Sequence, residues 1–234
     1  MTLSSKKKRA LFKEMKIFCV IPAYNEEKSI AAVITRVKPF VDRIVVVNDC
    51  SSDNTAKIVQ DYDVTLISHP LNRGQGAALQ TGNEYALAQG ADIIIHFDAD
   101  NQFQAEEIPE VIAPLLANRA DAVLGSRFLG KQSNLPALKK NLIMPLARTV
   151  NRLFFNIKLS DPQSGFRALN RHAAQTIKIQ QDGMAHCSEI MHQLFTNKLR
   201  VSEVPITVVY HEFGQKFSGG FKIVKDIIIK KIIK

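Results

Sequence analysis

The sequence predicts an α/β fold in which a mostly parallel central sheet is flanked by helices. Short apolar runs alternate with segments of helical spacing from residue 17 to about residue 125. This order is typical of parallel strands joined by right-handed crossovers. The three isoleucines at 93–95 form a continuous apolar run, as in a strand covered on both faces. Polar residues directly follow several of these runs, at the sheet edge where such folds bind ligands.

Five strands are expected in this region, at residues 17–21, 43–47, 63–67, 93–97 and 121–125. Helices are expected between them, at residues 28–38, 53–60, 77–89 and 105–118. Pro22 should end the first strand, because proline cannot donate a hydrogen bond to a neighbouring strand.

The pattern changes after Phe128. Residues 135–157 combine an apolar helical stripe with basic side chains, and Pro145 should kink or divide that helix. The final run, FKIVKDIIIKKIIK, has the same basic and amphipathic character. Each stretch fits either a core helix or a helix resting on a membrane surface, and the sequence leaves both open.

The 234 residues suffice for one well-buried domain. We expect a basic tail at 1–15, a single domain at 16–215 and a basic amphipathic tail at 216–234. The net charge of +9 belongs to the two ends of the chain. Residues 1–16 and 216–234 each carry +5, which leaves −1 for residues 17–215.

This charge distribution argues against a nucleic-acid partner, since such proteins usually carry their basic patch on the folded body. An anionic membrane surface is the expected partner, because each nearby basic residue gains about 1 kcal/mol there. Solvated tails that aid solubility are the alternative. The three cysteines are far apart and fit a reduced compartment. No secretory signal and no apolar run of membrane-span length occur. We therefore expect a cytoplasmic protein held peripherally at the inner face of the membrane.

The most informative motif is FDADNQ at 97–102. Asp98 and Asp100 follow the apolar run at 93–95, and Gln102 adds an amide oxygen. Hard oxygen ligands of this kind suit Mg²⁺ or Mn²⁺, which keeps positions open for phosphate oxygens. A polar turn before the next helix is the alternative. The position after a buried strand favours the metal site.

Three further polar motifs lie after strands: IPAYNEE at 21–27, VVNDCSSDNT at 46–55 and LNRGQGAAL at 71–79. Gly74 and Gly76 precede a helix, where glycines permit close backbone approach and favour anions. The sequence contains no GxxxxGK[ST] element, so a nucleoside triphosphatase of that type is not supported.

Together these segments resemble the family 2 glycosyltransferases of the GT-A fold, and most of all the polyprenyl-phosphate sugar synthases of the dolichyl-phosphate mannose synthase type. The matching elements, in order, are PAYNE, VVNDCSSDNT, NRGQGAAL, FDADNQ, GSRF, DPQSGFRAL, Glu189 and EVPI. Their order over residues 17–210 is more specific than any single motif. The resemblance implies a Rossmann-like GT-A domain with a nucleotide-sugar half at 16–128 and an acceptor half at 129–215.

The resemblance also implies roles for individual residues. Those expected to bind the nucleotide-sugar donor are Pro22, Tyr24, Glu26, Asp49, Gly76 and Asp98. Those expected to hold Mg²⁺ or Mn²⁺ across the donor diphosphate are Asp98, Asp100 and Gln102. Those expected at the reaction centre are Asp100, Arg127, Arg167 and Glu189. Gln75 stands where relatives often have Lys, and Asn48 and Cys50 where they often have Asp and Gly, so the donor base, GDP or UDP, is left open.

The expected reaction is metal-dependent, inverting transfer of a hexosyl group from a nucleotide diphosphate sugar to a dolichyl or undecaprenyl phosphate at the cytoplasmic membrane face. The cation would neutralise the departing diphosphate. An ionised phosphate attacks without strong base help, whereas an alcohol acceptor would need a base such as Asp161 or Glu189.

The first alternative is a soluble family 2 glycosyltransferase acting on a saccharide or protein hydroxyl, in polysaccharide or glycoconjugate synthesis. A sugar-1-phosphate nucleotidyltransferase is less consistent with the motifs, because it normally opens with a basic, glycine-rich stretch. A non-catalytic nucleotide- or membrane-binding module is a further alternative.

Overall fold

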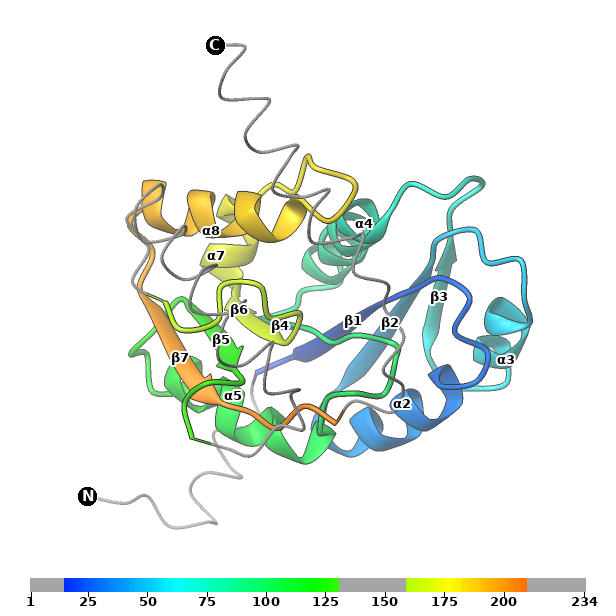
Figure 1. Cartoon of the computed structure of the whole chain (residues 1–234), viewed down its shortest axis with the longest axis horizontal. Coiled ribbons are helices and arrows are strands. Elements are labelled where there is room, and N and C mark those ends of the chain that lie inside the picture. The colour runs from blue at the N-terminus through cyan, green and yellow to red at the C-terminus, as the bar shows by residue number, and fades with distance from the viewer. Residues whose placement is uncertain (1–14, 131–158, 210–234) are drawn as a thin grey trace, which may run out of the picture.

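The computed structural model describes residues 15–130 and 159–209 (Figure 1). The predicted amphipathic helix at 135–157 and the predicted tail at 216–234 lie outside the described residues, as do residues 1–14 of the N-terminal tail.

One seven-stranded sheet runs through the described residues, in the order β3-β2-β1-β4-β6-β5-β7 (Figure 1). Its strands are β1 Ile17–Ala23, β2 Arg43–Asn48, β3 Thr65–Ser68, β4 Ile93–His96, β5 Ala122–Ser126, β6 Arg167–Asn170 and β7 Val201–Pro205. Neighbouring strands pair in parallel, except where β6 pairs antiparallel with β4 and β5. The prediction of a mostly parallel α/β sheet is confirmed.

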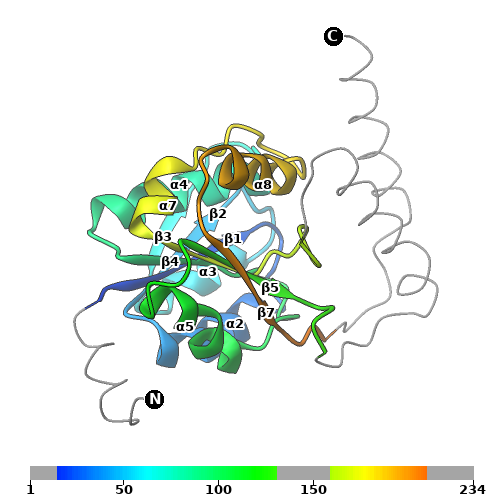
Figure 2. The same cartoon turned by 90° about the vertical axis from the view of Figure 1, so that its left-hand side faces the viewer.

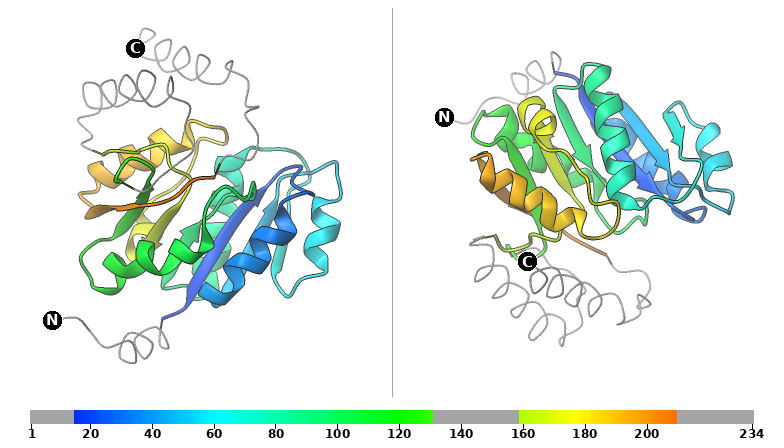
Figure 3. Two further views of the ribbon diagram at one scale, coloured as in Figure 1. Left: turned by 60° about the horizontal axis from the view of Figure 1, so that its bottom comes forward. Right: turned by 90° about the horizontal axis from the view of Figure 1, so that it is seen from above.

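Helices cover both faces of this sheet. In the part of the chain that the structure describes, the α-helices are α2 Ile30–Val37, α3 Thr55–Gln60, α4 Gln75–Ala88, α5 Ile108–Leu116, α7 Arg171–Thr176 and α8 His186–Thr196. Short 3-10 helices, η1 and η2, occupy Lys38–Phe40 and Ala105–Glu107. One core cluster joins the sheet to α2 and α5, and a second joins its other face to α4, α7 and α8 (Figure 2). Seen from above, α4, α7 and α8 lie side by side over that second face (Figure 3).

The first strand does not end at Pro22, as the sequence predicts, but continues to Ala23. The register explains why proline is tolerated there. The carbonyl of Ala23 accepts a hydrogen bond from the Asp49 amide on the β2 side, so the nitrogen of the preceding residue faces the β4 side. Pairing between β1 and β4 ends at Val20. Pro22, which has no N–H to donate, therefore lies beyond the last paired residues of β1 and β4.

The topology gathers the polar motifs at one edge of the sheet. The parallel strands β1, β2 and β4 end there, and the motif residues that follow each strand begin there. Strand β6 runs the opposite way, and its first residue, Arg167, pairs with His96, the last residue of β4. The edge that carries Asp98 and Asp100 therefore also receives Arg167 from a distant part of the chain.

Candidate functional site

Asp98 and Asp100 lie in a turn that directly follows β4. Asn101 adopts a left-handed conformation with φ of 58°, and the amide of Gln102 donates to Asp100 Oδ1 over 3.1 Å. The carbonyl of Gln102 accepts a hydrogen bond from the Val209 amide. The turn is therefore shaped by its own aspartate and anchored to the segment that follows β7.

The carboxylates near this turn repel one another. Burial raises the pKa of Asp98 to about 6, and the charge of Asp100 adds to the rise. The nearby positive charges of Arg167 and Arg127 act in the opposite direction. The pKa of Glu26 is also raised, by burial and by the charges of Asp100 and Asp53. A bound cation would relieve this excess of negative charge.

The oxygen donors fit a divalent cation that is shared with a ligand. Among the described residues, no group of three or more His, Cys, Asp or Glu side chains has an arrangement that could hold a metal by itself. Mg²⁺ and Mn²⁺ typically take one or two protein carboxylates and complete their shell with phosphate oxygens and water. Asp98 and Asp100 match that pattern, and Gln102 lies in the same turn.

Two residues outside the predicted set fix the carboxylate of Asp98. The side-chain amide of Gln75 donates to Asp98 Oδ1 over 2.8 Å. Gly165 lies so close that a Cβ atom there would overlap the same carboxylate. The sequence signals these residues only through their motifs, NRGQG and DPQSGFRAL, because neither is near Asp98 in the chain.

The loops after β1 and β2 are joined by hydrogen bonds. They carry three residues of the predicted donor pocket, Tyr24, Glu26 and Asp49. The amide of Asn25 donates to Ser51 Oγ over 3.0 Å, and the amide of Glu26 donates to Thr55 Oγ1 over 2.8 Å. Tyr24 is half exposed beside them, whereas Pro22 is buried within β1. The structure therefore places the PAYNEE and NDCSSDNT motifs side by side.

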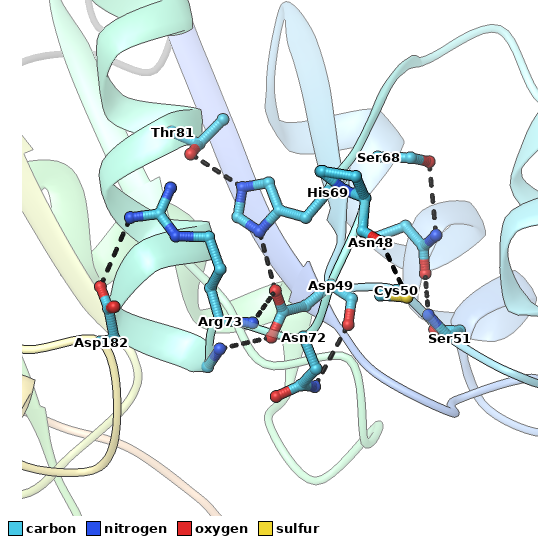
Figure 4. A network of polar contacts seen from close by, with 12 residues as sticks. Asn48, Asp49, Cys50, Ser51, Ser68, His69, Asn72, Arg73, Thr81 and Asp182 are labelled. Atoms are coloured by element: carbon cyan, nitrogen blue, oxygen red, sulfur yellow. Dashed lines mark hydrogen bonds and ion pairs between the residues drawn. The ribbon is translucent and has the colours of Figure 1, made fainter.

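Asp49 lies at the centre of a polar network (Figure 4). Asp49 is only 2% exposed. The carboxylate accepts hydrogen bonds from the amides of Arg73, over 2.9 Å, and Gly74, over 2.6 Å. His69 Nδ1 lies 2.7 Å from Asp49 Oδ1, and His69 Nε2 lies 2.9 Å from Thr81 Oγ1. Asp49 thus holds the loop before α4 in place, and its contact with the donor base or ribose stays a prediction.

Gly76 and Glu189 both contact the loop that precedes α8. The Gly76 amide donates to the Asp182 carbonyl over 2.8 Å, and a Cβ atom at Gly76 would overlap the Gln181 carbonyl. The Glu189 carboxylate accepts hydrogen bonds from the amides of Gln180 and Gln181, over 2.9 and 2.8 Å. The Gly76 amide is therefore used within the protein, contrary to an open anion site at this helix start. The donor-binding role of Gly76 and the reaction-centre role of Glu189 stay predictions.

Arg127 is held by Asp161 through a two-pronged ion pair. Arg127 Nε and Nη2 donate to the two carboxylate oxygens over 2.6 and 2.7 Å. Asp161 is buried, and its own amide donates to Glu203 Oε1 over 3.0 Å. The Arg127 side chain remains 18% exposed. A guanidinium held in place on a partly exposed side chain suits the predicted phosphate contact.

Arg167 is fully buried, with an exposure of 0%. Its Nη2 donates to Cys187 Sγ over 2.9 Å, while Nε and Nη1 have no hydrogen-bond partner among the described residues. Burial tends to raise the pKa of Cys187, but the charge of Arg167 and the hydrogen bond from His186 lower it to about 7. Arg167 therefore acts on Asp98 as a buried charge in this structure, and its contact with a phosphate stays a prediction.

The comparison with protein families identifies this chain. The model named Glycosyl transferase family 2 matches residues 18–178, which includes the PAYNEE, NDCSSDNT, NRGQG and FDADNQ motifs. The chain belongs to this family. It is a sugar-transferring enzyme with a GT-A fold.

Curated relatives and solved structures agree with this family. The UDP-N-acetylglucosamine–dolichyl-phosphate N-acetylglucosaminyltransferase of Methanococcus voltae is 33% identical, over 93% of this chain and 97% of its own. The undecaprenyl-phosphate mannosyltransferase of Micrococcus luteus is 29% identical, over 88% of this chain and 89% of its own. The glucosyl-3-phosphoglycerate synthase of Mycobacterium tuberculosis, solved with Mn²⁺, UDP-glucose and phosphoglyceric acid, has the same fold. It gives a TM-score of 0.71 at 20% identity and covers 93% of this chain and 79% of its own.

Proposed function

We propose that this family 2 glycosyltransferase transfers a hexosyl group, with inversion, from a nucleotide diphosphate sugar to a polyprenyl phosphate, with Mg²⁺ or Mn²⁺ as cofactor. The observation that carries the proposal is the pair Asp98 and Asp100, which follow β4 at the edge of the sheet where such folds bind ligands. Burial and the charge of Asp100 raise the pKa of Asp98, and a bound cation would offset this cost. The names of two relatives supply the acceptor class, since both include a polyprenyl phosphate.

Different residues around the proposed cation site would bind the cation, a phosphate group and the nucleotide. Asp98 and Asp100 would hold the cation, with Gln102 in the same turn. When bound, the cation supplies charge neutralisation for the departing diphosphate. Arg127, held in place by Asp161, would bind a phosphate group. The joined loops that carry Tyr24 and Glu26 would line the nucleotide pocket.

The candidate bases of the site favour a phosphate acceptor over an alcohol. Asp161 is paired with Arg127, and Glu189 accepts two backbone amides. An alcohol acceptor needs a base within hydrogen-bond reach of its proton. A phosphate monoester has its second pKa near 6, so it is largely ionised at neutral pH and can attack without one. Asp161 and Glu189 already bind other groups of the protein. A lipid phosphate, which needs no base, therefore fits this site better than an alcohol acceptor.

The membrane part of the proposal depends on the ends of the chain. Within residues 15–130 and 159–209, no helix has the length and apolar character needed to cross a bilayer. The two ends carry +5 each, and we propose that they hold the enzyme peripherally at the inner face of the membrane. On this account residues 16–128 bind the nucleotide sugar and residues 129–215 bind the acceptor.

A donor and acceptor screen tests this function. The enzyme is heated with Mn²⁺ and a series of UDP- and GDP-sugars, because a bound ligand raises the melting temperature by mass action. The best donor is then offered to a short polyprenyl phosphate and to soluble saccharides. We expect transfer to the lipid phosphate alone. Transfer to a soluble hydroxyl acceptor alone would select the rival, a soluble glycosyltransferase of the same family.

A further inference from the structure

Gln75 is the first residue of α4, and its side chain reaches the carboxylate of Asp98. The amide donates to Oδ1 over 2.8 Å, while Oδ2 lies on the side of Gly165. An amide donor is neutral, so it orients a carboxylate without repelling a cation that binds the same group. A lysine in that place would add a positive charge beside the cation.

The backbone on both sides of Gln75 is clamped. On one side, the Gly74 amide donates to Asp49 Oδ2 over 2.6 Å. On the other side, the Gly76 amide donates to the Asp182 carbonyl over 2.8 Å. A Cβ atom at either glycine would overlap backbone of the Gln181–Asp182 segment. The start of α4 is therefore packed tightly between Asp49 and the loop that precedes α8.

That loop is in turn held by α8 and by the segment before α4. Glu189, in the first turn of α8, accepts hydrogen bonds from the amides of Gln180 and Gln181. Arg73 Nη2 lies 3.6 Å from Asp182 Oδ1, which adds a partly exposed ion pair across the junction (Figure 4). An unbroken series of contacts therefore runs from α8 through residues 180–182 to the backbone that carries Gln75.

We propose that Gln75 is a positioning residue, which orients the Asp98 carboxylate for a divalent cation, and that the Asp49 and Asp182 clamps hold Gln75 in place for this task. The proposal rests on the cation-binding role proposed above for Asp98. Hydrogen-bond partners of metal-binding carboxylates typically contribute 10–100-fold to metal affinity or activity.

The test replaces Gln75 by Met, which keeps the length of the side chain but cannot donate a hydrogen bond. Binding of Mn²⁺ in the presence of UDP is followed by loss of the free-ion electron paramagnetic resonance signal. We expect Gln75→Met to weaken apparent Mn²⁺ affinity about tenfold. We also expect its defect in sugar transfer to shrink as Mn²⁺ is raised. Gln75→Asn, whose amide is one carbon too short to reach Asp98, should show the same loss.

Gln89→Met is the matched control, because Gln89 is exposed at the far end of the same helix. It should bind Mn²⁺ like the unaltered enzyme. Asp98→Ala separates the two proposals. If Asp98→Ala loses Mn²⁺ binding while both Gln75 variants, folded by melting temperature, bind Mn²⁺ normally, the positioning role is overturned and the proposed function stands. If Asp98→Ala itself binds Mn²⁺ normally, the cation site of the proposed function is wrong.

Discussion

Asp98 lies in surroundings that disfavour its ionised form. Burial and the charge of Asp100 raise its pKa to about 6, while its ordinary value is near 3.8. The folded protein thus binds this proton more tightly than the unfolded chain does. The carboxyl group therefore stabilises the fold most at low pH, and this contribution is lost as the pH rises from about 4 through about 6. At neutral pH and without a cation, the ionised Asp98 carboxylate destabilises the folded state.

This linkage predicts the effect of removing the charge. In the presence of EDTA at pH 7.5, Asp98→Asn should raise the melting temperature by at least about 2 °C, the shift expected from 1 kcal/mol in a domain of this size. At pH 4 the two proteins should melt closer together, because Asp98 is then largely protonated. Thermal unfolding at both pH values measures this. A variant that is less stable at pH 7.5 would contradict the electrostatic account of the site.

At the scale of elements, the junction between α4 and the loop before α8 decides how the site is held. Gly74 and Gly76 allow the start of α4 to touch backbone atoms of residues 181 and 182. Glu189 then fixes that loop from α8. The role of Glu189 suggested by these contacts is to hold a loop, which differs from the acid at the reaction centre that the family resemblance implies.

Two substitutions of Glu189 distinguish these roles. Glu189→Gln keeps an oxygen that can accept the backbone amides, whereas Glu189→Ala removes it. If Glu189 holds the loop, Glu189→Ala should lose apparent Mn²⁺ affinity severalfold and Glu189→Gln should recover most of it. Titration of Mn²⁺ in the presence of UDP measures both. Equal and large losses of turnover in the two variants, with normal Mn²⁺ binding, would instead assign Glu189 to the chemistry.

The elements also show how far the sequence alone can lead. The apolar runs predict β2 and β4 closely, because strands buried on both faces carry a strong local signal. The strand β6 was not predicted, since RALN is short and becomes a strand only by pairing with β4 and β5. Likewise, FDADNQ indicates the carboxylates, but the Gln75–Asp98 and Glu189–Gln181 contacts depend on tertiary packing that no local pattern encodes.

At the scale of the whole molecule, charge is separated between the body and the ends of the chain. Residues 17–215 carry a net charge of −1, whereas residues 1–16 and 216–234 carry +5 each. Attraction to anionic lipid acts within about a Debye length, so it falls with ionic strength. A near-neutral body with two basic ends is consistent with an enzyme whose acceptor is confined to a membrane.

Deletion of residues 216–234 should weaken co-sedimentation with anionic vesicles and reduce the effect of salt on it. A second variant, in which Lys222, Lys225, Lys230 and Lys231 become Gln, keeps the apolar residues and removes four charges. It should show the same loss if charge dominates, and a smaller loss if the isoleucines dominate. Vesicles of neutral lipid serve as the control. Equal binding of the full chain and the deletion variant would assign membrane association to another part of the protein.

The most direct test of the central claim measures sugar transfer to a short polyprenyl phosphate by the full chain and by Asp100→Ala, each with Mn²⁺ and with EDTA. Asp63→Ala, at an exposed aspartate outside the site, is the matched control. The account predicts transfer by the unaltered enzyme and by Asp63→Ala with Mn²⁺ only, and no transfer by a folded Asp100→Ala. Turnover that is equal in Asp100→Ala and the unaltered enzyme, or that persists in EDTA, would contradict it.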